Sequence, residues 1–104
     1  MSTRKKSDAL EFLETLTGGP LTLGRLIETI RITDELTQAG LAKKLGISRS
    51  HLNDIEKGNK AVSPGRAVRF ARALGYSERQ FLTLSLQAIL DLAKLKFKVN
   101  IEAA

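Results

Sequence analysis

Three polar side chains between residues 49 and 53 have the chemistry needed to bind the base edges of nucleic acid. Arg49 carries a guanidinium that can pair with the acceptors of guanine, and Asn53 carries an amide that can pair with adenine. Ser50 adds a hydroxyl between them. On a helix these three side chains would project away from the apolar face formed by Leu52 and Ile55, so we expect them to contact bases.

Basic and amide residues surround these three positions. The net charge is +6, and residues 43–72 hold eight basic and two acidic residues, so this segment carries the whole excess. A basic excess beside side chains that can bind bases favours an anionic nucleic-acid partner over a merely solvated surface. The candidate phosphate contacts are Lys43, Lys44, His51, Lys57, Asn59 and Lys60. For His51, a plain solvated side chain is an equally good interpretation.

Two short helices are expected to position these side chains. Thr37 and Ser48 are hydroxyl residues that can accept from the free amides of a first helical turn. Gly46 and Gly58 stand where each helix would end. The apolar faces of the two helices consist of Leu41, Ala42, Leu45, Leu52 and Ile55. Because the turn at residues 45–48 is too short for antiparallel packing, the pattern predicts a helix-turn-helix, whose second helix lies in the DNA major groove.

A longer pattern runs through this region: Arg31, Leu36-Thr37-Gln38, Leu41-Ala42, Leu45-Gly46-Ile47-Ser48, Ile55-Glu56 and Gly58. With this pattern, residues 21–76 resemble the phage-repressor and Cro type of DNA-binding domain, the XRE family. The resemblance implies an all-α, lambda-repressor-like fold of five helices. Gly40 departs from the family pattern, since it replaces the Glu or Gln that often completes a capping box. A glycine within a helix costs roughly 1 kcal/mol relative to alanine.

The resemblance also implies roles for single residues. The three candidates for base contact occupy the positions that such repressors use for that purpose. Gln38 is similar to a glutamine that holds a backbone phosphate beside the free amides of its helix. Arg31 and Glu56 occupy the positions of a structural ion pair that clamps the first helix of the domain to the recognition helix.

Three further helices complete the expected domain and its extension. The first covers residues 21–31, and the second covers residues 64–74, with Ser63 as its cap and Gly75 at its end. The third starts with a capping box formed by Ser77 and Gln80 and runs from residue 78 to about residue 95. We therefore expect a DNA-binding domain at 21–76 and a dimerisation segment at 77–104.

The C-terminal segment carries more apolar surface than so small a domain can cover. The long helix has a second apolar stripe, which includes Leu82, Leu86 and Ile89. After it, residues 96–102 alternate between apolar and polar side chains, which is typical of a β-strand. The expected dimer interface consists of Leu82, Leu86, Ile89, Phe97, Val99 and Ile101. Alternatively, the strand could pair with the sheet of another protein while the helix alone forms the dimer.

The remaining sequence excludes several classes of protein. With no cysteine and one histidine, we expect no disulfide, metal site or cofactor, and we find no motif of an enzyme. No stretch is long and apolar enough for a membrane span or a signal peptide, so we expect a cytoplasmic protein. The resemblance to phage repressors implies a bacterial or phage origin and association with the nucleoid when the protein is bound to DNA. Residues 1–20 form an N-terminal arm with a possible short helix at 8–16, whose role stays open.

Two functions fit these expectations. In the first, the chain is a homodimeric transcriptional repressor that binds double-stranded DNA at a palindromic operator. In the second, it is the antitoxin of a toxin–antitoxin pair, which binds a small toxin and represses its own operon. The two are compatible, because such antitoxins are also repressors.

Overall fold

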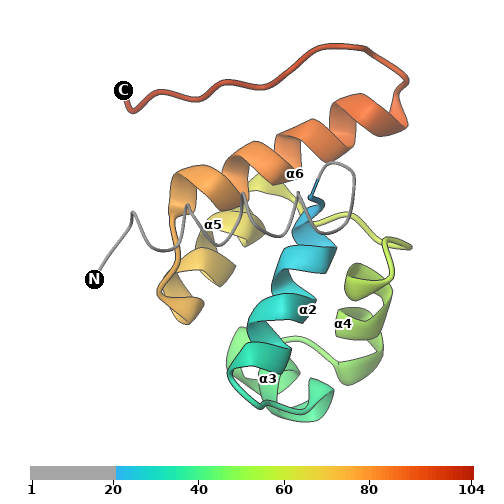
Figure 1. Cartoon of the computed structure of the whole chain (residues 1–104), viewed down its shortest axis with the longest axis vertical. Helices are drawn as coiled ribbons and strands as arrows, with labels where there is room; N and C mark the ends of the chain where they lie inside the picture. Colours follow the sequence, from blue (N-terminus) through green and yellow to red (C-terminus); the bar gives the residue numbers. More distant parts are fainter. Residues whose placement is uncertain (1–20) are drawn as a thin grey trace.

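The structure is a computed structural model in which residues 21–104 are described, and these residues form five α-helices and no strand (Figure 1). The helices are α2 (Leu23–Thr33), α3 (Gln38–Leu45), α4 (Arg49–Glu56), α5 (Pro64–Leu74) and α6 (Glu78–Leu92). The prediction of an all-α fold is therefore confirmed. The helix expected at residues 8–16 lies outside the described residues. Within residues 21–104, no helix has the length and apolarity needed to cross a membrane.

Each of these helices begins at a hydroxyl residue. The side chain of each N-cap accepts a hydrogen bond from the backbone N–H three residues later, and the caps are Thr22, Thr37, Ser48, Ser63 and Ser77. All but Thr22 were expected from the sequence. Each such cap is worth about 1 kcal/mol because it satisfies an amide that has no acceptor inside the helix.

A residue with a left-handed backbone conformation follows within two residues of the end of each of these helices. Three of these residues are glycines with φ between 72° and 79°, namely Gly46, Gly58 and Gly75. The end of α6 differs from the expected position near residue 95, because the helix stops at Leu92. Lys94 adopts a φ of 59°, and the N–H of Leu95 donates to the carbonyl of Leu90 at 2.9 Å, which turns the chain back.

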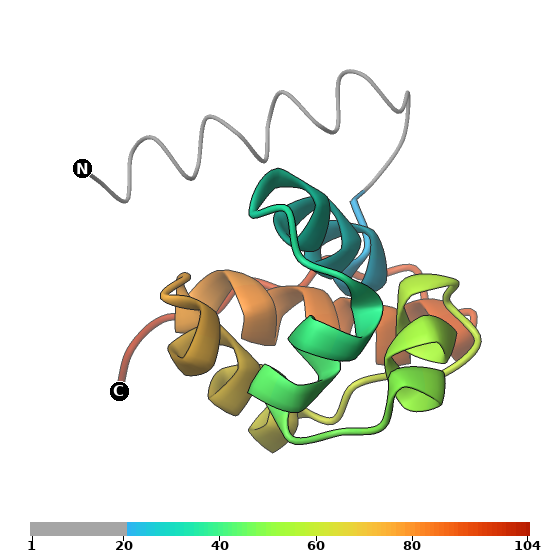
Figure 2. The ribbon, with the colours of Figure 1, turned by 90° about the horizontal axis from the view of Figure 1, so that it is seen from below.

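A single apolar core joins the helices. Its fully buried members come from α2, α3, α4, α5 and α6, and include Ile27, Leu41, Leu52, Ala67 and Phe81. Figure 1 shows α3 at one end of the molecule and the C-terminal segment, beyond α6, at the other, and Figure 2, seen from the α3 end, shows α3 in front of the C-terminal segment. Because Phe81 is part of this core, the first half of α6 packs with the helix-turn-helix in one unit.

A close approach of two backbones fixes α2 against α4. Gly24 in α2 is buried, and a Cβ atom at this position would overlap the carbonyl oxygen of Ile55. The same Cβ atom would lie 3.4 Å from the Cα of Glu56. Only glycine therefore allows α2 to lie this close to the end of α4.

The C-terminal β-strand expected from the alternation is not present in the described residues. After α6 the chain runs back along this helix as an extended segment (Figure 1). A strand requires a neighbouring strand for its hydrogen-bond ladder, and residues 21–104 supply none. Instead, the side-chain amide of Gln87 donates to the carbonyl of Phe97 at 2.8 Å and accepts from the N–H of Val99 at 3.0 Å.

Candidate nucleic-acid interface

The helix-turn-helix consists of α3, a turn at Gly46 and α4. The φ of Gly46 is 74°, and the N–H of Ile47 donates back to the carbonyl of Ala42 at 3.0 Å. Leu52 and Ile55 bury one face of α4 in the core. The predicted helix-turn-helix is therefore present, and its second helix is held by its apolar face.

Arg49 and Ser50 occupy the exposed side of α4. Both residues are exposed, and they form the first turn of the helix directly after the cap Ser48. The hydroxyl of Ser48 accepts from the N–H of His51 at 3.0 Å, which fixes the start of α4. A short helix with polar residues exposed in its first turn has the form that major-groove recognition requires.

Arg31 and Glu56 form a bidentate ion pair between α2 and α4. The Arg31 Nε donates to Glu56 Oε2 at 2.8 Å, and Nη2 donates to Oε1 at 3.1 Å. Arg31 Nη1 also donates to the carbonyl of Leu36 at 3.2 Å. The hydrogen bonds to Glu56 raise the pKa of Arg31 above its ordinary value, even though burial lowers it. Since the Glu56 side chain is 2% exposed, this acid is held inside the protein and does not face a DNA phosphate.

Gln38 extends this cluster to Asn53. The Gln38 Nε2 donates to Glu56 Oε1 at 3.0 Å and to Asn53 Oδ1 at 3.1 Å. An ionised carboxylate only accepts, so the group that Gln38 directs at Glu56 must be its NH₂. Both N–H bonds of that group are thus used inside the protein. A phosphate contact by Gln38 would therefore come from its backbone amide at the start of α3.

Asn53 differs in its surroundings from the other two candidates for base contact. It is half-buried, and its Oδ1 is held by Gln38. This bond fixes which way the amide points, while its NH₂ can still donate and its Oδ1 keeps a second lone pair. The donor and acceptor that Asn presents to adenine are therefore both retained.

The candidate phosphate contacts lie at the ends of α3 and α4. Lys43 and Lys44 are exposed in the last turn of α3, and His51 is half-buried in α4. Lys57, Asn59 and Lys60 are exposed in the loop after α4. The start of this loop is fixed by Asp54, whose carbonyl accepts from the N–H groups of residues 59 and 60 at 2.8 and 3.3 Å.

Two residues that bear on this site were missed in the sequence, one buried behind the loop and one on α4. Ser85 of α6 is 2% exposed, and its hydroxyl donates to the carbonyl of Val62 at 2.7 Å, which fixes the end of the same loop. Asp54 lies one turn after Ser50 in α4 and is half-buried, so a carboxylate stands on this helix. Carboxylates accept from cytosine N4. The spacing of four residues between Ser50 and Asp54 could have indicated that both lie on the same side of α4. No nearby residue could have indicated the role of Ser85, because its partner is distant in the sequence.

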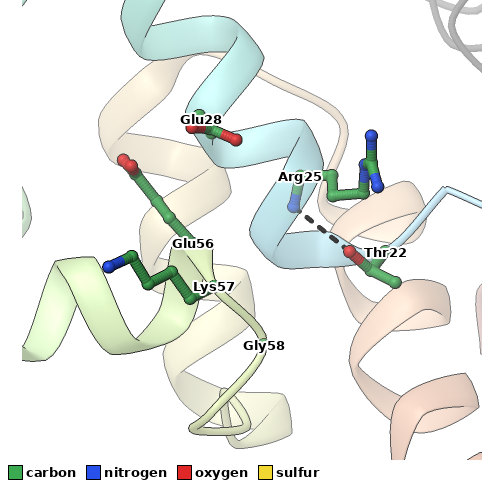
Figure 3. A pocket seen from close by; sticks show the side chains of 6 residues that line it. All are labelled: Thr22, Arg25, Glu28, Glu56, Lys57 and Gly58. Carbon is green, nitrogen blue, oxygen red and sulfur yellow. Dashed lines mark hydrogen bonds between the residues drawn. The ribbon is translucent and has the colours of Figure 1, made fainter. Parts of the chain in front are cut away.

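A shallow pocket lies beside the ion pair, between the start of α2 and the end of α4 (Figure 3). Its volume is about 450 Å³, and it is lined by Thr22, Arg25, Glu28, Glu56, Lys57 and Gly58. In Figure 3 the cationic ends of Arg25 and Lys57 point away from each other, so they do not form a joint anion site. Within residues 21–104, no group of three or more histidine, cysteine or acidic residues is placed to hold a metal.

Comparisons with known proteins agree with this geometry. No curated protein matches the sequence. The chain is similar to the crystal structure of a candidate antidote protein of a plasmid maintenance system from Nostoc punctiforme PCC 73102. The two share 27% identity over 72% of this chain and 82% of that chain, with a TM-score of 0.64. A family model described as helix-turn-helix matches residues 27–81, more than half of the chain. The chain therefore belongs to the XRE-type helix-turn-helix family and contains the DNA-binding domain of that family.

Proposed function

We propose that the chain is a sequence-specific regulator of transcription, a homodimeric repressor that binds double-stranded DNA at a palindromic operator. The observation that carries this proposal is the recognition helix itself. α4 is anchored in the core by Leu52 and Ile55, and it exposes Arg49 and Ser50 in its first turn. The basic residues at the ends of α3 and α4 supply the electrostatic attraction that all DNA binding needs.

Within this proposal, base contacts and phosphate contacts have separate sources. Arg49 and Ser50 read base edges directly, and Asn53 reads through an amide whose orientation Gln38 sets. The phosphates are bound by the backbone amides at the start of α3 and by the side chains of Lys43, Lys44, Lys57, Asn59 and Lys60. His51 lies on the same helix and adds a further polar contact.

The proposed dimer places two recognition helices on successive turns of DNA. A single α4 covers few base pairs, so specific binding by this fold normally needs two copies about 34 Å apart. α6 supplies the contact surface, since Leu82 and Leu86 are half-buried and Ile89 is 44% exposed. The segment beyond α6 adds Phe97, which is 66% exposed. In this scheme residues 21–76 bind DNA and residues 77–104 form the dimer.

The test is a selection from random double-stranded DNA with the full chain, followed by measurement of affinity at several salt concentrations. We expect an enriched palindromic sequence and a dissociation constant for it that is about 10³-fold or more below that for random DNA. Sedimentation equilibrium of the DNA-free chain measures the dimer separately. Equal affinity for selected and random sequences would reject the role of a specific regulator.

A second candidate function is supported by the structural comparison. The similar protein from Nostoc punctiforme is described as an antidote of a plasmid maintenance system. By analogy, this chain is an antitoxin that binds a small toxin and represses its own operon. Co-expression with the product of a small adjacent reading frame tests this function. A stable complex of the two, and relief of toxicity by this chain, would support it, and independent behaviour of the two proteins would exclude it.

A further inference from the structure

The C-terminal segment has two backbone edges, and one of them is in use. Gln87 binds the carbonyl of Phe97 and the N–H of Val99, so its amide takes the place that a neighbouring strand would have. The N–H of Phe97 also donates, at 3.0 Å, to the carbonyl of Leu95. In extended chain, the backbone groups of odd and even residues point to opposite edges. Gln87 therefore occupies the edge of the odd residues.

The edge of the even residues is open. Within the described residues, the structure gives no hydrogen-bond partner for the backbone groups of Lys98 and Asn100. Both residues are exposed, whereas Val99 and Ile101 are half-buried. An extended segment with an unpaired edge is a template for another extended segment.

The open edge points away from α6. Gln87 of α6 holds the edge of the odd residues, and the backbone groups of the even residues point the opposite way. The unpaired edge is therefore accessible to the backbone of another extended segment.

We propose that two copies of the chain pair through this edge as antiparallel strands, with the two-fold axis at Val99. This inference rests on the proposed homodimer and specifies its register. Val99 then lies opposite its own counterpart, and the backbone of Lys98 exchanges hydrogen bonds with Asn100 of the partner copy. All of these bonds use even residues, as the open edge requires.

The side chains support this register. It places Lys96 opposite the acidic Glu102 of the partner copy, twice in the symmetric dimer. It also places the exposed ring of Phe97 opposite Ile101 of the partner copy. Opposite charges and aromatic–aliphatic pairs are the favourable cross-strand pairs in antiparallel sheets.

The neighbouring registers that use the same edge are less favourable. A shift toward the N-terminus places Lys98 opposite its own counterpart, and two like charges directly opposite destabilise a sheet. A shift toward the C-terminus centres the axis on Asn100 and leaves Phe97 opposite Ala103 of the partner copy. The axis at Val99 pairs Phe97, Val99 and Ile101 among themselves and places no like charges opposite each other.

Disulfide crosslinking of single-cysteine variants tests the register, and the natural chain supplies a clean background because it has no cysteine. The variants are Lys98→Cys, Val99→Cys and Asn100→Cys. Directly opposite residues in a pair without hydrogen bonds have Cα atoms about 4.5 Å apart, within the range that a disulfide spans. We therefore expect Val99→Cys to form the covalent dimer fastest of the three. Faster crosslinking by either neighbour would overturn the proposed register.

A charge exchange provides an independent measurement in the chain without cysteine. Lys96→Glu and Glu102→Lys each place like charges opposite each other at two points. Each should raise the dissociation constant of the dimer by roughly two- to thirtyfold in sedimentation equilibrium. The double variant should return it to the natural value. Single variants with unchanged dimerisation, or a double variant that is weakened further, would contradict the pairing.

The outcomes separate this inference from the proposed function. If the natural chain stays monomeric at every concentration in sedimentation equilibrium, the proposed strand pairing is wrong. It is also wrong if another protein, and not a second copy of this chain, pairs with the open edge. DNA selection with the natural chain is scored separately, so sequence-specific binding by a dimer of different register would leave the regulator role intact.

Discussion

Gln38 and Asn53 are joined by a hydrogen bond of 3.1 Å that connects the first turn of α3 to the recognition helix. Because Gln38 also donates to Glu56, the chain of contacts continues to Arg31 on α2. The orientation of a side chain that we propose to read bases is thus set by residues that lie on two other helices.

The first prediction concerns this orientation. Gln38→Met removes both donors and keeps most of the side-chain volume, so the Asn53 amide becomes free to rotate. We expect reduced discrimination at one base pair, by part of the ~1–3 kcal/mol that a good contact provides. The measurement is binding to four operators that differ at that base pair. An unchanged order of preference in Gln38→Met, with altered preference in Asn53→Ala, would show that Gln38 does not set the orientation.

Arg49→Ala should weaken specific binding by ~1–3 kcal/mol and relax the preference at one base pair. The reason is the loss of the guanidinium that we propose to pair with guanine. The comparison is with random DNA, on which the loss should be smaller. If specific and random DNA lose affinity equally, Arg49 binds phosphate and does not read a base.

Lys60→Ala should weaken binding to all DNA sequences about equally, because a phosphate contact carries no sequence information. The slope of log K against log salt should fall by about one. Arg79→Ala, an exposed change on α6 outside the basic segment, serves as the matched control. An unchanged slope in Lys60→Ala would remove this residue from the interface.

Arg31→Met should lower the free energy of unfolding by ~3–5 kcal/mol, because it leaves the buried carboxylate of Glu56 without its cation. Thermal and urea unfolding measure the effect. The control is Arg72→Met, which breaks the exposed pair with Glu78 and should change stability little. Similar melting of the two variants would mean that the buried pair does not clamp α2 to α4.

Gly24→Ala should destabilise the fold by about 1–3 kcal/mol or more, because the new methyl group overlaps the backbone of Ile55. Gly65→Ala in α5 is the matched control, since a Cβ atom there meets no heavy atom within 4 Å. That change should stabilise the protein by up to about 1 kcal/mol. Equal effects of the two alanines in urea unfolding would contradict the close approach of α2 and α4.

Local features of the fold were predictable from the sequence. The caps Thr37, Ser48, Ser63 and Ser77 and the ends at Gly46, Gly58 and Gly75 depend on hydrogen bonds within a few residues. The helix-turn-helix follows from these signals and from the apolar spacing. The sequence placed the end of α6 about three residues too late. The left-handed residue after this helix is Lys94 and not a glycine, so the usual sequence signal for a helix end is missing.

Features that depend on contacts distant in sequence were not predictable from local patterns. The buried hydrogen bond from the Ser85 hydroxyl to the carbonyl of Val62 joins two residues that are 23 positions apart in the sequence. The close approach at Gly24 is set by the packing of α2 on α4. The alternation at residues 96–102 predicted a β-strand, which the described residues do not contain, and it could not indicate that a glutamine side chain would bind this segment.

The recognition helix contains two kinds of position, with different consequences for how the protein can diverge. Arg49 and Ser50 are exposed, so substitutions there change the surface offered to DNA at little cost in stability. Asn53 is bonded into the cluster of Gln38, Glu56 and Arg31, so its replacement also disturbs the packing of three helices. Under the proposed base contacts, related proteins can acquire new operators by single changes at the first two positions, whereas a change at Asn53 requires compensating changes elsewhere.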